Sequence, residues 1–176
     1  MRYKVTIHPK RDAGSWEERL DRLLPLLGHR NWIVVADSAY PAQSNPGIET
    51  ISTGEDHLRL LGEVVDAIAA HNHVRANVYL DAELAHVPEQ DAPGVSELRG
   101  ELDRLLGPRA HTLEHEQIIA RLDESARLFN IVILKSTGVI PYSSVFLELD
   151  CGYWTEDAEK RLRNSLRDST RAASAG

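Results

Sequence analysis

The sequence predicts one α/β domain in which helices cover both faces of a mostly parallel sheet, a three-layer α/β/α architecture. Two short runs, residues 32–36 and 131–134, contain only apolar residues, which is typical of strands that are buried on both faces. Segments with the apolar spacing of amphipathic helices alternate with these runs along the chain. The length of 176 residues fits one domain that buries a core without disulfides.

The first helix has a recognisable start and end. Ser15 and Glu18 are three residues apart and resemble a capping box, and leucines follow at helical spacing. Pro25 has no backbone N–H, so we expect this helix to end early or to kink there, and Gly28 is a typical stop. A short alternating segment before the helix, residues 3–7, predicts a strand.

The remaining strands and helices follow from hydrophobic periodicity. Strands are predicted by apolar runs or by alternation at 32–36, 49–52, 74–80, 131–134 and 144–149. Helices are predicted by apolar spacing at 55–70, 95–106, 113–128 and 155–171, the last with Thr155 as its N-cap. We expect residues 172–176 to fray. The domain therefore spans residues 1–150, and residues 151–176 form a C-terminal helical tail.

Composition and charge exclude several classes of function. Lys and Arg total 20 against 27 Asp and Glu, giving a net charge of −7, whereas a surface that binds nucleic acid normally has a basic excess. No apolar run approaches the roughly 20 residues of a membrane span, and the first residues do not resemble a signal peptide. We therefore expect a cytoplasmic protein that binds neither nucleic acid nor a membrane. Cys151 is the only cysteine, so a Cys-based zinc cluster within one chain is excluded.

Asp37 comes directly after the buried run at 32–36. In sheets of this class, ligands bind just beyond the carboxyl ends of the strands. Residues 38–44 then supply hydroxyl and amide groups, which suit a polyol ligand. An Asp at the end of a strand is as often a turn former, so both interpretations stay open. Residues 135–142 follow the second buried run in the same way.

His29 lies in the turn before the first buried strand, eight residues ahead of Asp37. A histidine titrates close to neutral pH and so suits proton transfer, and an Asp held nearby can orient a hydroxyl group. A histidine in a loop is more often a capping or surface residue, so this interpretation needs support from other residues.

The other histidines raise the question of a metal site. His71 with His73, and His111 with His115, are possible pairs of ligands. Position 112 is Thr, however, where the zincin pattern has Glu, and no cysteine supports either pair. Lys135 to Gly138 does not match a phosphate-binding P-loop. We therefore expect no metal and no cofactor, with solvated helix ends as the role of His71 and His73.

Three segments occur in a characteristic order. They are Gly28-His29, then the strand that ends in Asp37-Ser38-Ala39-Tyr40-Pro41, and finally Thr137-Gly138 followed by Pro141-Tyr142-Ser143-Ser144. Together they resemble the D-ribose pyranase and L-fucose mutarotase family (RbsD/FucU-like) over roughly residues 20–149. The resemblance implies an isomerase that interconverts ring or anomeric forms of a free monosaccharide, without metal or nucleotide, in a homo-oligomer that is commonly a decamer.

The resemblance also implies roles for individual residues. His29 matches the catalytic histidine that transfers a proton, and Asp37 matches the carboxylate that binds the sugar. His115 resembles a histidine that contacts the sugar. The segment Tyr142-Ser143-Ser144 matches the residues that close on the sugar, partly from a neighbouring subunit.

Two positions depart from the family pattern. Ser144 stands where the family has Asn, and Val139 stands where it has Glu. The amide that would bind the sugar is thus missing, and a carboxylate of the motif is lost. A non-catalytic sugar-binding or assembly protein on the same fold therefore stays open as the alternative.

Apolar residues near the end of the chain suggest a surface for self-association. Apolar residues gather there, namely Val145, Phe146, Leu147, Leu149, Tyr153 and Trp154. An exposed patch of this kind usually marks an interface, so it supports the homo-oligomer that the resemblance implies. In the alternative, the tail helix from Thr155 folds back and covers these residues.

Overall fold

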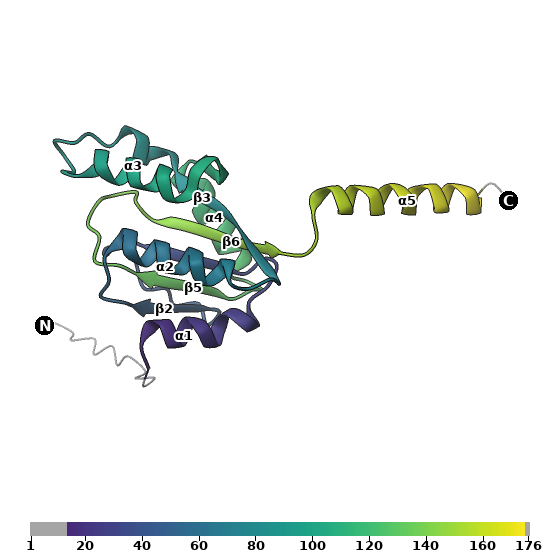
Figure 1. The fold of residues 1–176 in the computed structure, drawn as a ribbon, viewed down its shortest axis with the longest axis horizontal. Helices are drawn as coiled ribbons and strands as arrows, with labels where there is room; N and C mark the ends of the chain where they lie inside the picture. The colour runs from purple at the N-terminus through teal and green to yellow at the C-terminus, as the bar shows by residue number, and fades with distance from the viewer. Residues whose placement is uncertain (1–13, 175–176) are drawn as a thin grey trace, which may run out of the picture.

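A six-stranded sheet with helices on both faces organises the computed structural model, which describes residues 14–174 (Figure 1). The strands are β1 (Trp32–Ala36), β2 (Ile48–Ser52), β3 (Val74–Asp81), β4 (Ala110–Leu113), β5 (Ile131–Lys135) and β6 (Val145–Cys151). The helices are α1 (Trp16–Leu23), α2 (His57–Ala69), α3 (Val95–Leu106), α4 (His115–Ser125) and α5 (Glu156–Ser174). The predicted strand at 3–7 lies outside the described residues.

Strand β1 shows how the three layers arise. Its side chains alternate between two separate apolar clusters, and all five are buried. Ile33 and Val35 pack into the cluster that contains the apolar stripes of α1, α2 and α3. Trp32 and Val34 pack into the other, which contains the buried side of α4. A strand covered on both faces needs apolar residues throughout, and this confirms the predicted three-layer class.

The sheet has the strand order β2-β5-β1-β6-β3-β4. Its neighbouring strands are parallel, except that β6 runs antiparallel to both β1 and β3. Val145, the first residue of β6, pairs with Val35 on one side and Leu80 on the other. The start of β6 therefore lies at the same edge of the sheet as the carboxyl ends of β1, β3 and β5. We call this side of the sheet, where the parallel strands end, the carboxyl edge. The opposite side, where they begin, is the amino edge.

Local signals correctly placed the starts of α1 and α5. The Ser15 hydroxyl accepts a hydrogen bond from the backbone N–H of Glu18 at 3.3 Å, which confirms Ser15 as the N-cap of α1. The helix ends at Leu23, and Pro25 lies in the 3-10 turn that follows, as its missing N–H predicts. Thr155 likewise accepts from the N–H of Ala158 at 3.1 Å at the start of α5.

Predicted boundaries of α4 and α5 were wrong. The helix predicted at 113–128 runs only from His115 to Ser125, and Ala110–Leu113 is instead strand β4, paired with the end of β3. This edge strand is short and its sequence is partly polar, so its pairing with a distant segment leaves no clear local pattern. Helix α5 also continues to Ser174, beyond the predicted end at 171.

The proposed apolar surface near the end of the chain was also mostly wrong. All four of its β6 residues are fully buried, namely Val145, Phe146, Leu147 and Leu149. They belong to the core because β6 lies between β1 and β3, under helices on both faces. Tyr153 and Trp154 remain 78% and 42% exposed. Helix α5 does not fold back over the sheet but extends away from it (Figure 1). No helix within residues 14–174 is long and apolar enough to cross a membrane.

Candidate functional site

Asp37 and Ser144 meet at the carboxyl edge. Asp37 follows β1 and Ser144 precedes β6, so the pairing of Val35 with Val145 brings them together. The Ser144 hydroxyl donates to Asp37 Oδ2 at 2.9 Å, and the other carboxylate oxygen accepts from the N–H of Ala39 at 2.8 Å. Asp37 is therefore a turn former, and its half-buried carboxylate is also held in a fixed orientation beside the site. Each oxygen keeps a further lone pair that can accept from a ligand.

Asp81 and His115 form a second pair at the same edge. Asp81 ends β3 and its side chain is 1% exposed, whereas His115 begins α4. Asp81 Oδ2 lies 3.1 Å from His115 Nδ1, and the Glu83 carboxylate accepts from the backbone N–H of His115 at 3.0 Å. These contacts fix the start of α4 and the orientation of the imidazole. The buried Oδ1 of Asp81 has no hydrogen-bond partner among the described residues.

Burial changes the pKa of the Asp81 carboxyl in this pair. Removal from water raises the pKa of the Asp81 carboxyl to about 6, opposed by His115 and reinforced by the negative charges of Glu83 and Asp37. Burial, with the neighbouring carboxylates, likewise raises the pKa of Tyr40 to about 12. The carboxyl edge therefore holds one acid that changes its protonation state close to neutral pH, beside a phenol that stays protonated.

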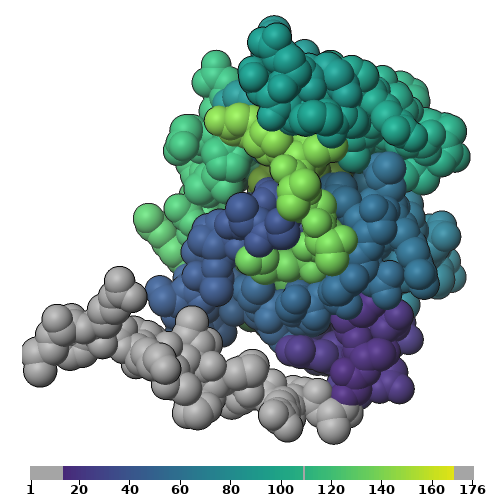
Figure 2. Space-filling view, turned by 90° about the vertical axis from the view of Figure 1, so that its left-hand side faces the viewer, coloured from purple at the N-terminus to yellow at the C-terminus, as the bar shows by residue number. Residues whose placement is uncertain are grey.

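The loop between β5 and β6 carries Tyr142 over this pair. The rings of Tyr142 and His115 meet edge to face, with centroids 5.7 Å apart. The backbone of Tyr142 has φ +58°, a left-handed conformation that non-glycine residues seldom adopt and that is often found at functional sites. Figure 2 looks onto the carboxyl edge, where the yellow-green loop crosses the middle of the face between the dark-blue segment after β1 and the teal segments above it. Tyr142 itself is 42% exposed.

His57 holds the loop between β5 and β6 in place through buried hydrogen bonds. Its Nε2 donates to the carbonyl of Ser143 and its Nδ1 lies by the hydroxyl of Ser136, both at 2.8 Å. Burial lowers the pKa of His57, so the imidazole is neutral there. Ser143 is buried as well and donates to the carbonyl of Ile140 at 2.7 Å. A side chain at Gly138 would come within 3.0 Å of His57 Cβ, so the loop also needs glycine there.

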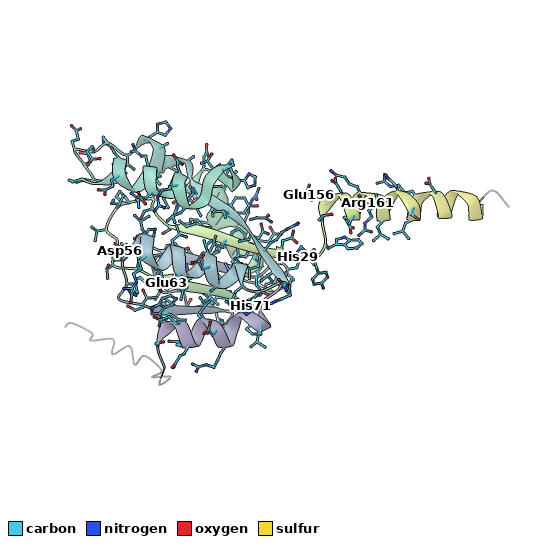
Figure 3. The ribbon with its side chains drawn as sticks, in the orientation of Figure 1. His29, Asp56, Glu63, His71, Glu156 and Arg161 are labelled. Carbon is cyan, nitrogen blue, oxygen red and sulfur yellow. The ribbon has the colours of Figure 1, made fainter. Side chains whose placement is uncertain are left out.

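His29 lies on the amino edge, away from this cluster. The five-residue strand β1 separates the two edges by roughly 16 Å at about 3.3 Å per residue. Figure 3 shows His29 on the side from which α5 leaves, with Asp56, the N-cap of α2, on the opposite side. Within one chain the structure therefore brings together Asp37, His115, Tyr142 and Ser144, and it does not bring His29 to them.

A carboxylate also holds His29. Its Nδ1 lies 2.8 Å from Asp150 Oδ1, and Arg75 donates to the other oxygen of Asp150 at 2.6 Å. Burial alone would raise the pKa of Asp150, but hydrogen bonds from Arg75, the N–H of Cys151 and His29 lower it overall. The His29 side chain is 61% exposed. It borders an open groove of about 860 Å³ that Trp154 also lines.

A sequence profile of the RbsD / FucU transport protein family matches residues 12–151. The chain belongs to this family. The match spans most of the chain and confirms the resemblance that Gly28-His29 and the later motifs indicated. No curated protein sequence matches the chain.

Solved structures share the fold of this RbsD/FucU chain. Bacillus subtilis RbsD complexed with D-ribose matches with a TM-score of 0.56 and 19% identity, over 82% of this chain and 99% of that chain. The Streptococcus pneumoniae fucose mutarotase in complex with L-fucose matches with a TM-score of 0.52 and 17% identity, over 78% and 93%. FucU from Bifidobacterium longum matches with a TM-score of 0.51 and 17% identity, over 76% and 92%.

Sequence reasoning missed three residues that organise this RbsD/FucU chain. Asp81 directly ends the strand predicted at 74–80, so the positional rule that selected Asp37 also selects Asp81. Asp150 comes after the strand predicted at 144–149, and only the antiparallel direction of β6 places it beside His29. His57 gave no local signal, because both of its partners are far away along the chain.

Three of the other histidines in this RbsD/FucU chain make structural contacts. His71 Nδ1 lies 2.8 Å from the carbonyl of Ala67, and His73 Nε2 lies 3.1 Å from that of Leu27. His111 packs against the ring of Tyr79. Among residues 14–174, no group of three or more His, Cys, Asp or Glu is arranged to hold a metal ion.

Proposed function

We propose that the chain is a sugar isomerase, a mutarotase or pyranase that interconverts ring or anomeric forms of a free monosaccharide by acid–base catalysis. The observation that carries this proposal is the cluster at the carboxyl edge. There the buried Asp81 orients His115 beside the exposed Tyr142, with the Asp37 carboxylate at the same edge. The D-ribose and L-fucose bound to the structural relatives support a free aldose as the substrate class.

The chemistry needs two proton transfers. One group removes the proton of the anomeric hydroxyl while another protonates the ring oxygen, and the bond from the ring oxygen to the anomeric carbon breaks. Closure through the other face, or through another hydroxyl, reverses both transfers. General acid–base catalysis typically contributes about 10²–10⁴-fold. Because the uncatalysed reaction already proceeds in water, such a gain suffices.

Two histidines suit these transfers, each held at Nδ1 by a carboxylate so that Nε2 can meet a substrate. His115 does so at the carboxyl edge and His29 at the amino edge. We propose that the chain forms a homo-oligomer, with the decamer expected from the family. In it, the amino edge of one copy meets the carboxyl edge of the next. The exposed His29 beside its open groove supports this arrangement, and His29 then completes the neighbour's site as the second proton-transfer group.

Asp37 and Tyr142 bind the sugar in this proposal, and the two serines hold the residues that do so. Asp37 accepts hydrogen bonds from hydroxyl groups, and the Tyr142 ring covers an apolar face of the ring. Ser144 orients Asp37, because its hydroxyl is already committed to that carboxylate, and the buried Ser143 supports the loop. In this proposal both serines are buried and hold their neighbours, and the direct ligand that the family's Asn supplies is missing. This observation favours the second candidate function, a non-catalytic sugar-binding protein.

Saturation-transfer NMR on a panel of free aldoses, including D-ribose and L-fucose, tests the proposal. We expect exchange between anomers or ring forms to accelerate in the presence of the protein for at least one sugar. Binding without acceleration would favour the non-catalytic candidate. Neither binding nor acceleration for any aldose would contradict both.

A further inference from the structure

Two buried polar atoms at the carboxyl edge have no hydrogen-bond partner within the part of the chain that the structure describes. They are the hydroxyl oxygen of Tyr40 and the Oδ1 atom of Asp81. Tyr40 is 6% exposed and Asp81 is 2% exposed, so bulk water hydrates neither atom. A buried polar atom without a hydrogen bond is unfavourable and is uncommon in native proteins. These two atoms therefore indicate a site that binds a polar group.

Both side chains lie on the face of the sheet that α4 covers. Asp81 ends β3, and its other carboxylate oxygen lies by His115 at the start of α4. Tyr40 belongs to the apolar cluster that contains the buried side of α4, and its ring centroid lies 6.4 Å from that of Phe146. Phe146 in β6 pairs with Tyr79, which comes two residues before Asp81 in β3. The Tyr40 ring therefore packs over β6, the strand between β1 and β3.

The charges around the Tyr40 hydroxyl agree with this placement. Its pKa is raised to about 12, first by burial and then by the carboxylates of Asp123, Asp81 and Asp37. The phenol therefore keeps its proton and can donate a hydrogen bond, but none of these carboxylates accepts one from it. Burial raises the pKa of the Asp81 carboxyl to about 6, so at about pH 8 its oxygens only accept. A donor thus lies near an acceptor, and no hydrogen bond joins them.

We propose that the Tyr40 hydroxyl and Asp81 Oδ1 form a buried subsite for one hydroxyl group. A hydroxyl oxygen accepts from the phenol, and the same group donates its own proton to the carboxylate. An ammonium group offers no acceptor, and a carbonyl oxygen offers no donor. Either of these would leave the phenol proton or the carboxylate oxygen without a partner. The hydroxyl comes from a sugar or from a water molecule, and the first source rests on the proposed function.

With a sugar as the source, Tyr40 determines specificity. A site that is built to bond a hydroxyl group rejects the analogue that lacks it, because the polar groups of the site then stay unpaired. Asp81 also holds the imidazole of His115 through its other oxygen. The subsite therefore fixes one sugar hydroxyl relative to the histidine that we propose for proton transfer.

Tyr40→Phe removes only the hydroxyl and tests the subsite in the full-length chain. Tyr79→Phe is the matched control, because the Tyr79 hydroxyl already donates to Glu148 at 3.1 Å. Titration calorimetry at about pH 8 compares the aldose that the wild type binds best with each of its monodeoxy analogues. For a sugar hydroxyl, we expect Tyr40→Phe to weaken binding of the parent sugar about tenfold. The analogue that lacks the bonded hydroxyl should bind the variant and the wild type equally, and Tyr79→Phe should change neither affinity.

Urea unfolding without sugar separates the two sources. If water supplies the hydroxyl, Tyr40→Phe unfolds at a lower urea concentration than the wild type, and no single deoxy analogue is distinguished. This measurement decides for or against a bound water even if no aldose binds, a result that would contradict the proposed function alone. An unfolding midpoint that is unchanged or raised, together with unchanged sugar affinity or no sugar binding, would overturn the subsite. The same losses in Asp123→Asn would also overturn it, because they would identify Asp123 as the partner of the phenol.

Discussion

The two edges of the sheet carry the same pair of residue types in different surroundings. At the carboxyl edge, Asp81 is 1% exposed and its carboxyl has a pKa raised to about 6. At the amino edge, the Asp150 side chain is 24% exposed, and hydrogen bonds from Arg75 and His29 help to lower its pKa. Asp150 therefore stays ionised and stabilises positive charge that develops on its histidine, whereas Asp81 can take up a proton close to neutral pH. Surroundings of this kind separate acid from base roles in enzymes.

Removing either histidine is the largest expected effect. We predict that His29→Ala and His115→Ala each slow anomer exchange by about 10²–10⁴-fold, the usual contribution of a general acid or base. Saturation-transfer NMR gives the rates, and circular dichroism reports whether the variants stay folded. His86→Ala, an exposed histidine in the turn after β3, is the matched control and should retain the wild-type rate. A wild-type rate in either site variant would remove that histidine from the mechanism.

The two carboxylates should give opposite dependences of stability on pH. The raised pKa of Asp81 contributes stability that is full below about pH 4 and is lost as the pH rises through about 6. Asp81→Asn should therefore gain unfolding free energy relative to wild type between pH 4 and pH 7, by up to roughly 3 kcal/mol for a pKa raised from 3.8 to about 6.

Asp150→Asn is the comparison for that measurement. The lowered pKa of Asp150 contributes stability above the unfolded value near 4, which is lost as the pH falls. The advantage of wild type over Asp150→Asn should therefore shrink in acid. Urea unfolding at a series of pH values decides between the two dependences, and the same sign for both variants would contradict the assignment.

His57 should matter for stability more than for chemistry. His57→Ala removes two buried hydrogen bonds and leaves the carbonyl of Ser143 without its donor, which costs roughly 2–3 kcal/mol. Because burial lowers the pKa of His57, its contribution is present above about pH 6.5 and is lost as the pH falls. Thermal unfolding of the variant and wild type across this range measures both effects. An unchanged midpoint would show that the loop is held by other contacts.

Tyr142 gives the smallest expected effect on stability. Tyr142→Gly relieves the left-handed backbone at φ +58° and should add about 1 kcal/mol. It also removes the ring that faces His115, so affinity for the sugar should fall. Tyr142→Phe keeps the ring and should bind nearly as tightly as wild type. Titration calorimetry and thermal unfolding compare the two, and equal affinity in Tyr142→Gly would argue against a role in binding.

Local patterns predicted much of the fold because buried strands need runs of apolar residues and helix starts need capping residues, and both can be recognised in the sequence. The apolar run of β1 and the caps at Ser15 and Thr155 depend on neighbouring residues, and the structure confirms them. Strand β4 and the burial of β6 depend on pairing with distant segments. Neighbouring residues do not indicate which distant strands will pair. Strand β4 was therefore missed, and the apolar residues of β6 were interpreted as an interface.

The candidate site was predictable only in part, for the same reason. Asp37, His115 and Tyr142 were found through motifs, and the topology brings them to one edge. The eight residues from His29 to Asp37 suggested closeness, but most of them form an extended strand that separates the two side chains. The site that we propose to be shared between copies accounts for both the motif and this geometry.

Subunit complementation tests this central claim most directly. Copies carrying His29→Ala and copies carrying His115→Ala, distinguished by separate tags, are co-expressed and purified as mixed oligomers. Where one copy's amino edge meets the next copy's carboxyl edge, some sites regain both histidines, and random mixing should return about a quarter of the wild-type exchange rate. If the mixed oligomers stay as inactive as each variant alone, the shared site is wrong.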